Sequence, residues 1–265
     1  MVKNKFIIAI PARLDSVRLP NKVLELIGNK SMIFRVAESC CNLSGIEKTF
    51  LCTDNELIAE EVESLPLEII YKKGNFSSGT DRIFNSINEI IRSLSLPKDF
   101  PLKNLYIINV QGDQPFIKSQ TIIEFIKYIN RKESPEVITS FYKKNSFLTD
   151  KCKDIVKLTM SSKNDKVLYF SRSNIPHIDT RSLKNNSTIQ YQRKFHIGVY
   201  AYRFDILLKW GDLNKSTLEV CESLEQLRWL EYDIPIYAFE SYNEIMSIDN
   251  YMQLESAREK IKNNP

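Results

Sequence analysis

A basic loop follows the first apolar run of the chain, residues 6–10. Over residues 11–22 it carries three cationic side chains, those of Arg13, Arg18 and Lys22. Cationic groups, combined with the backbone N–H groups that a loop can expose, suit the binding of a polyphosphate. A solvated basic loop that binds nothing is an equally good interpretation when this segment is taken alone.

A single carboxylate, Asp113, follows a second apolar run at residues 105–110, within the sequence Gln-Gly-Asp. In open α/β sheets, ligands bind beyond the carboxyl ends of the strands, which is where such a turn would lie. Because Mg²⁺ prefers oxygen ligands and often takes only one or two carboxylates, Asp113 is well placed to hold it. The alternative is an aspartate that only stabilises a glycine turn.

A third segment, residues 77–82, places two serines and Gly79 at the predicted start of a helix. Backbone donors there could face a nucleotide, although Ser78 could equally serve as a helix cap. The chain has only seven glycines, and Gly79, Gly112 and Gly198 all lie in candidate site segments. Since glycine allows close backbone approach, these positions are suited to a ligand site. Together, the three segments predict a nucleotide-binding enzyme with a metal-assisted, phosphoryl-type reaction.

Short and long apolar patterns alternate along the first half of the chain and must position these segments. Helices are predicted where apolar residues recur at helical spacing, as in residues 32–37, 57–62 and 83–91. Strands are predicted at short runs rich in β-branched and aromatic residues, namely residues 6–10, 49–52, 67–71, 105–110 and 137–141. This alternation predicts an α/β fold with a doubly wound, mostly parallel sheet.

The second half of the chain is less regular. Its polar stretch at residues 179–194 is predicted to be a surface excursion. The predicted strands are residues 155–160, 167–170, 197–202 and 234–239, and the predicted helices are residues 216–229 and 250–261. We predict a single domain, residues 1–265, with a β-rich insertion around residues 150–230.

The composition excludes several classes of protein. Hydrophobic residues at 43% and charged residues at 26% are ordinary for a globular protein and exclude disordered and fibrous classes. The net charge of +4, without blocks of Lys or Arg, argues against nucleic-acid and membrane-surface partners. Five cysteines without a CxxC spacing argue against a disulfide framework or a zinc site. With no signal-peptide or membrane-span pattern, we expect a reducing cytoplasm.

Taken in order, the candidate segments resemble the 3-deoxy-manno-octulosonate (Kdo) cytidylyltransferases, also called CMP-Kdo synthetases. The resemblance runs through nearly the whole chain, and the joint order and spacing of its parts are specific. It is carried by residues 10–13 (IPAR), 18–20 (RLP), Lys22, 78–82 (SGTDR), 109–113 (NVQGD), 169–172 (YFSR), 175–176 (IP), 196–203 (HIGVYAYR), 218–219 (LE), Glu222 and 224–228 (LEQLR).

The resemblance implies a nucleotide-diphospho-sugar transferase-like fold and a role for particular residues. The nucleotide-binding residues that it implies are Ala12, Arg13, Lys22, Ser78, Gly79 and Arg82. The substrate-binding residues that it implies are Gln111, Arg172, His196, Tyr200, Glu225 and Gln226. The implied catalytic residues are Asp113, Arg13, Lys22 and Asp249, with Asp113 and Asp249 as the ligands of Mg²⁺.

The reaction implied by the resemblance joins CMP from CTP to Kdo, for lipopolysaccharide biosynthesis. The anomeric hydroxyl of the sugar acid attacks the α-phosphorus of CTP and releases pyrophosphate, with no covalent enzyme intermediate. Catalysis would rest on in-line positioning and on the metal. Whether His196 transfers a proton or only forms a hydrogen bond stays open. The family also implies a homodimer built largely through the second-half insertion.

The chain departs from the family pattern at three points. Residues 247–250 (SIDN) stand where the family commonly has an Asp-Thr pair, so the predicted metal ligand Asp249 is kept but its neighbour changes. His177 stands where an aromatic residue is usual, and Phe195 stands where a basic residue is typical. Because His177 and Phe195 lie near the expected sugar pocket, one alternative is a cytidylyltransferase for another acidic sugar, such as 8-amino-Kdo or a nonulosonate. A second alternative is a silent nucleotide-binding protein on the same fold.

Overall fold

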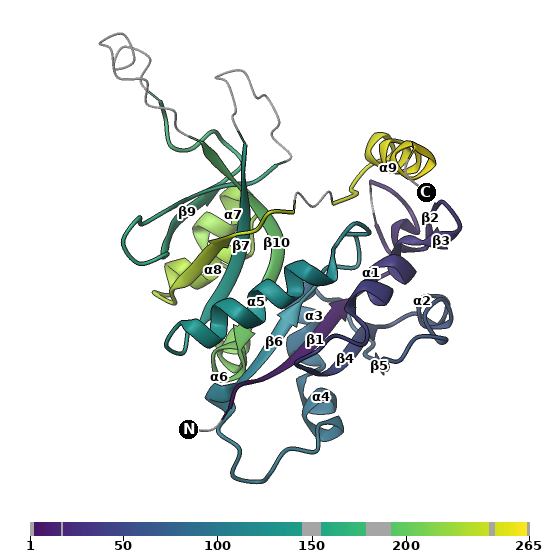
Figure 1. Ribbon diagram of the computed structural model, residues 1–265, viewed down its shortest axis with the longest axis horizontal. Helices are drawn as coiled ribbons and strands as arrows, with labels where there is room; N and C mark the ends of the chain where they lie inside the picture. Colours follow the sequence, from purple (N-terminus) through teal and green to yellow (C-terminus); the bar gives the residue numbers. More distant parts are fainter. Residues whose placement is uncertain (1–2, 17, 145–154, 179–191, 244–246, 264–265) are drawn as a thin grey trace. The chain divides into compact units, whose positions relative to one another are not determined.

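The computed structural model describes residues 3–16, 18–144, 155–178, 192–243 and 247–263. The chain forms two compact units, which we call unit 1 and unit 2 (Figure 1). Unit 1 comprises Met1–Ser134, Gly198–Gly211 and Ile245–Pro265, and unit 2 comprises Pro135–Ile197 and Asp212–Glu244. The predicted α/β class, a mostly parallel mixed sheet with flanking helices, is confirmed.

Unit 1 is built on parallel strands in the order β6-β1-β4-β5. These strands are β1 (Lys5–Pro11), β4 (Ile46–Thr53), β5 (Glu68–Tyr71) and β6 (Leu105–Asn109). The second part of β10 (Arg193–Arg203) joins the far side of β6 in antiparallel register, with Tyr200 opposite Asn109. Residues 6–11 of β1 are all buried, as expected for a central parallel strand covered on both faces.

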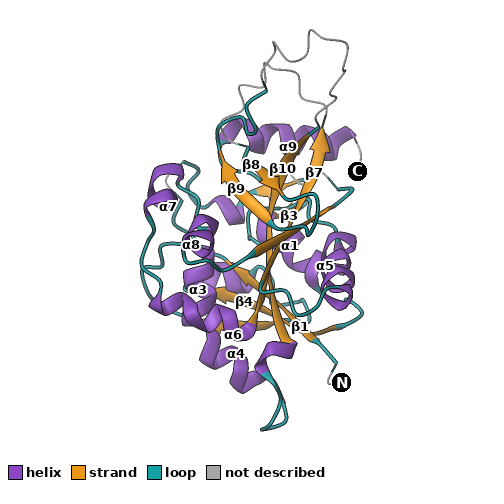
Figure 2. Ribbon diagram, turned by 90° about the vertical axis from the view of Figure 1, so that its left-hand side faces the viewer, coloured by secondary structure: helices purple, strands orange, loops and turns teal. Residues whose placement is uncertain are grey.

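Helices cover both faces of the unit 1 sheet, with α5 on one side and α3, α4 and α6 on the other (Figure 2). The helices of this unit are α1 (Met32–Cys40), α2 (Glu56–Glu60), α3 (Gly79–Asn85), α4 (Ile87–Ser93), α5 (Ser119–Arg131), α6 (Phe204–Leu207) and α9 (Tyr251–Asn263). Shorter elements are η1 (Lys22–Leu24), η2 (Leu102–Asn104) and the hairpin of β2 (Leu26–Ile27) and β3 (Lys30–Ser31). The element η4 (Leu208–Asp212) ends where unit 2 resumes.

Two features of unit 1 differ from the sequence prediction. Helix α5 was not predicted, although its buried residues Ile122, Phe125 and Ile129 recur at helical spacing. The helix predicted across residues 83–91 is two helices, because Ser86 ends α3 and begins α4.

Among the described residues, we find no helix with the length and apolar character needed to cross a membrane.

Unit 2 contains β7 (Val137–Lys144), β8 (Lys157–Met160), β9 (Val167–Ser171), β11 (Ile236–Glu240) and the first part of β10. Strand β11 is parallel to β7, whereas β8 is antiparallel to both β9 and β10. The helix predicted at 216–229 is two helices, α7 (Thr217–Glu222) and α8 (Gln226–Glu231), separated by Ser223 with a φ of 54°.

The predicted insertion around residues 150–230 overlaps unit 2, which begins earlier, at Pro135, and includes β7. Of the predicted surface excursion at 179–194, residues 179–191 lie outside the described residues, and Arg193 already begins β10. That the whole chain behaves as a single domain stays a prediction.

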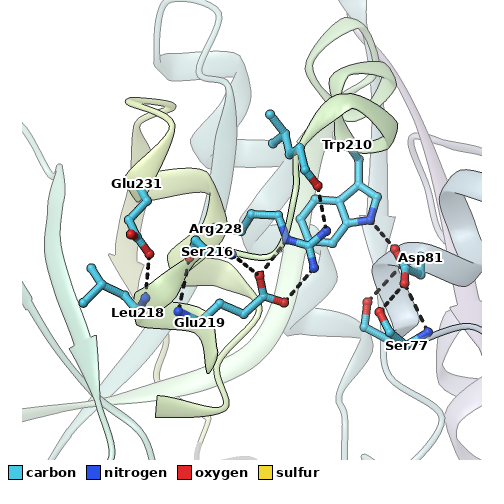
Figure 3. Close-up of polar contacts among 10 residues, drawn as sticks. Ser77, Asp81, Trp210, Ser216, Leu218, Glu219, Arg228 and Glu231 are labelled. Carbon is cyan, nitrogen blue, oxygen red and sulfur yellow. Dashed lines mark hydrogen bonds and ion pairs between the residues drawn. The ribbon is translucent and has the colours of Figure 1, made fainter. Parts of the chain in front are cut away.

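A buried ion pair joins the two helices of unit 2 (Figure 3). The guanidinium of Arg228 donates from Nε and Nη2 to the two carboxylate oxygens of Glu219, at 2.7 and 2.6 Å. The same carboxylate accepts a hydrogen bond from the backbone N–H of Ser216, whose hydroxyl caps α7. One buried carboxylate therefore fixes both the start of α7 and its position against α8.

We expect Arg228→Met to destabilise the chain strongly, because it leaves the Glu219 carboxylate buried without a counterion. The free energy of unfolding in urea should fall by about 3–5 kcal/mol. The control Glu47→Gln, which removes an exposed pair with Lys5, should cost less than about 1 kcal/mol. The double variant Glu219→Leu/Arg228→Met should recover much of the lost free energy of unfolding, because it leaves no unpaired charge buried. Equal stability of Arg228→Met and Glu47→Gln would contradict this prediction.

Candidate functional site

Lys22 joins two carboxylates that are far apart in the sequence. Its Nζ lies 2.7 Å from Oδ2 of Asp113 and 3.2 Å from Oδ1 of Asp249. The backbone N–H of Ile248 donates to the carbonyl of Asp113 at 3.0 Å, which brings the segment before α9 beside the turn after β6. The structure thus brings together three of the four predicted catalytic side chains.

The residues around Lys22 stabilise its charged form. Burial lowers the pKa of Lys22, but the neighbouring Asp113 and Asp249 raise it, and the pKa ends above its ordinary value. The side chain is 13% exposed, so solvent screens these contacts only partly. Arg18 adds a second cation at 3.0 Å from Asp249, on a side chain that is 63% exposed. Both carboxylates therefore share the partly buried Lys22, and Asp249 alone also contacts the exposed Arg18.

A cavity of about 160 Å³ opens beside this cluster, within unit 1. It is lined by Asp113, by Gln111 and by all six residues predicted to bind the nucleotide: Ala12, Arg13, Lys22, Ser78, Gly79 and Arg82. Phe76 also lines it and was not predicted. The three sequence segments that we singled out, after β1, after β6 and at the start of α3, therefore meet at one cavity.

Two glycines allow these segments to approach one another. A Cβ atom added at Gly79 would lie 2.7 Å from Oε1 of Gln111, which is closer than real Cβ contacts. A Cβ atom at Gly112 would lie 3.3 Å from the carbonyl oxygen of Pro11. Glycine at positions 79 and 112 thus gives the turn after β6 room to pack closely against the other two segments.

The start of α3 is fixed by several side chains. The hydroxyl of Ser78 accepts a hydrogen bond from the backbone N–H of Asp81 at 3.1 Å, so Ser78 is a helix cap as well as part of the cavity wall. The Asp81 carboxylate accepts from the Ser77 hydroxyl and from Nε1 of Trp210 (Figure 3). Arg82 forms an ion pair with Asp54 at 2.9 Å. These contacts hold the start of α3 in place at the cavity wall.

Arg13 differs from the other cations of the site. Its side chain is exposed, and it makes no hydrogen bond or ion pair with the residues that the structure describes. Because it also lines the cavity, its guanidinium remains available for an anionic ligand.

Four of the predicted substrate-binding residues lie in unit 2: Arg172, His196, Glu225 and Gln226. Arg172 is positioned by Glu222, whose carboxylate accepts from the Arg172 backbone N–H at 3.0 Å and whose carbonyl accepts from Nε at 3.2 Å. Buried Lys157 donates to the Arg172 carbonyl at 2.7 Å. Our sequence analysis missed Lys157 as a supporting residue; a lysine inside a predicted strand was its only signal.

His196 lies between Thr139, whose Oγ1 is 3.1 Å from Nε2, and the ring of Phe170. Burial lowers the pKa of His196 to about 3. The imidazole is therefore neutral at pH 7 and a weak base, which favours the hydrogen-bonding role over proton transfer.

The remaining predicted residues lie at the start of α8, within β10 and just after β6. Glu225 immediately precedes α8, and Gln226 is its first residue, 5% exposed. In unit 1, Tyr200 is buried in β10 and stacks on Tyr202 with ring centroids 5.8 Å apart. Gln111 donates from Nε2 to Oδ1 of Asn109 at 3.0 Å. Their roles toward a sugar stay predictions.

The sequence matches the cytidylyltransferase family over residues 7–245. It is 34% identical to the 3-deoxy-manno-octulosonate cytidylyltransferase of Rickettsia prowazekii (strain Madrid E) over 251 residues, which cover 94% of this chain and 92% of that protein. It is also 34% identical to the protein of the same name from Phocaeicola vulgatus over 266 residues, which cover 97% and 98% of the two chains.

A solved structure, that of a CMP:2-keto-3-deoxy-manno-octonic acid synthetase complexed with CTP, is similar throughout. The TM-score is 0.83 at 29% sequence identity, over 98% of this chain and 100% of the other. Sequence and fold therefore agree over nearly the full length. The chain is a nucleotidyltransferase and belongs to the family of 3-deoxy-manno-octulosonate cytidylyltransferases.

Proposed function

We propose that this chain transfers CMP from CTP to the anomeric hydroxyl of Kdo, giving CMP-Kdo and pyrophosphate for lipopolysaccharide biosynthesis. The observation that carries the proposal is the cavity at which Lys22 contacts both Asp113 and Asp249. Relatives that share most of the chain are named for this activity, and a similar structure was solved with CTP. A silent binding protein would not need the paired carboxylates beside the cavity.

The reaction needs groups that hold the triphosphate while one P–O bond forms and another breaks. The anomeric hydroxyl gives up its proton to solvent as its oxygen bonds to the α-phosphorus. The bond to the bridging oxygen of the β-phosphate breaks, and pyrophosphate leaves with that electron pair. Arg13 and Lys22 would bind the phosphates and offset the charge that develops on the leaving group. Lys22, which Asp113 and Asp249 hold beside the cavity, would also help to keep the phosphorus in line with the hydroxyl.

We extend the proposal to Mg²⁺, held by Asp113 and Asp249. Within the part of the chain that the structure describes, no group of three or more Asp, Glu, His or Cys residues gathers into a metal site. Two carboxylates that already share one cationic contact are nonetheless a suitable oxygen donor set for Mg²⁺, which completes its shell with waters and phosphates. The bound metal would neutralise the α-phosphate and lower the pKa of the attacking hydroxyl.

The proposal also includes a homodimer in the cytoplasm. In unit 2, Leu168 and Val220 are each 65% exposed, and a second copy of the chain would cover such apolar surface. Cys40, Cys41 and Cys52 are free and buried, and Cys221 is free and exposed, which is compatible with a reducing compartment.

The central test is a panel of substrates. The protein is incubated with Mg²⁺, each of the four nucleoside triphosphates and a set of acidic sugars, and pyrophosphate release is measured. We expect turnover only with CTP, and with Kdo above 8-amino-Kdo and the nonulosonates. Equal turnover with ATP or UTP would refute CTP dependence, and a preference for another sugar would replace Kdo as the acceptor.

We expect Asp113→Asn to retain the fold and lose turnover, because the amide cannot supply the anionic oxygen that holds Mg²⁺ beside the phosphates. The initial rate should fall by about 100-fold or more, consistent with loss of several kcal/mol of charge stabilisation by the metal. Asp99→Asn, which changes an exposed aspartate in the loop after α4, serves as the matched control. Near-normal activity of Asp113→Asn across a magnesium titration would remove Asp113 from the metal site.

We expect Arg172→Lys to impair use of the sugar acid far more than binding of CTP. Lysine keeps the charge but loses the planar fork that binds a carboxylate through two parallel bonds. The value of kcat/KM for the sugar, measured at saturating CTP, should fall by about tenfold to a hundredfold. Arg131→Lys, at the exposed end of α5, is the control. Unaltered sugar kinetics, or an equal loss of CTP affinity, would show that Arg172 does not hold the carboxylate.

A further inference from the structure

Phe76 is an aromatic side chain at the cavity to which the proposed reaction assigns no role. It is half-buried and lines the cavity together with Ala12, Ser78 and Gly79. Because these three neighbours have small side chains, they leave room beside the ring for a flat group. A phenylalanine left partly exposed at the wall of a polar cavity is a candidate for contact with an apolar part of a ligand.

The backbone beneath Phe76 is shaped to receive its ring. Gly74 has a φ of +155°, and a Cβ atom added to it would lie 2.7 Å from Cζ of Phe76. Any side chain at position 74 would therefore displace the ring, which is the far end of the Phe76 side chain. The glycine lets the ring lie against the backbone of its own loop and limits the positions that it can take.

Arg82 supports the ring from one face. Its guanidinium carbon lies 4.9 Å from the ring centroid, within the range of a cation–π contact. The guanidinium is in turn held by Asp54 at 2.9 Å and by the carbonyl of Lys72 at 3.4 Å, and the residue is only 4% exposed. Arg82 thus contacts one face of Phe76, and the ring itself lines the cavity.

We propose that Phe76 stacks against the pyrimidine base of the nucleotide substrate. The wall formed by Phe76 and its small neighbours suits a flat base, and the cations Arg13 and Lys22 suit the phosphates at the same cavity. This inference rests on the proposed function, because it takes the ligand to be CTP. Stacking uses a ring face that every base possesses, so Phe76 contributes affinity for the base and does not distinguish cytosine from uracil.

The test compares Phe76→Leu, which keeps apolar volume but removes the ring face, with Phe76→Tyr, which keeps the ring. Binding of CTP, CMP and inorganic pyrophosphate to the full chain is measured by calorimetry. Phe76→Leu should bind CTP and CMP about 5- to 150-fold more weakly, the range that loss of one base–aromatic stack produces. Pyrophosphate binding should be unchanged, and Phe76→Tyr should bind all three ligands like the wild type.

Three outcomes would overturn the inference. If Phe76→Leu binds CMP as tightly as the wild type, the ring does not contact the base. If pyrophosphate binding weakens by the same factor, the ring only shapes the cavity wall. If Phe76→Tyr loses as much affinity for CMP as Phe76→Leu, the ring face is not what matters. Failure of the proposed function is distinguishable, because then the wild type itself would not bind CTP.

Discussion

The site depends on one ammonium group that two carboxylates share. Lys22 comes from the short helix after the basic loop, Asp113 from the turn after β6, and Asp249 from the segment before α9. Without Lys22, the one ion-pair partner that the described residues leave to these carboxylates is the exposed Arg18, which contacts Asp249 and not Asp113. The ammonium group therefore holds together a site whose parts are separated by more than 200 positions, as the 227-residue interval between Lys22 and Asp249 shows.

The contact of Lys22 with the two carboxylates links two proposed functions of these side chains, binding of the triphosphate and binding of Mg²⁺. In the proposed function, a triphosphate would attract Lys22 away from the carboxylates, and Mg²⁺ would take its place between them. In the proposed reaction the two exchanges would favour each other. When the triphosphate takes Lys22, the carboxylates are left free to bind the metal, and when the metal takes the carboxylates, Lys22 is left free to bind the phosphates. Binding of nucleotide and binding of metal would then be thermodynamically coupled through Lys22.

Much of the fold could be predicted because its signals are local. The parallel strands of unit 1 are continuous apolar runs, and their carboxyl ends gave the site segments directly. The breaks at Ser86 and Ser223 depend on backbone geometry, such as the left-handed conformation of Ser223, which apolar spacing does not reveal. Phe76 was missed because an isolated aromatic residue in a loop carries no pattern. Its role in the wall follows only from Gly74 and Arg82, which the fold brings to it.

The cations of the site fall into two classes that should respond differently to ionic strength. Arg13 and Arg18 are exposed, so their attraction for an approaching polyphosphate reaches far only at low salt, since the Debye length shrinks from about 30 Å at 0.01 M to about 8 Å at 0.15 M. Lys22, only 13% exposed, acts at contact distance, where salt screens it little. Capture of the nucleotide would therefore slow as salt increases, while its retention, once Lys22 is engaged, would change much less.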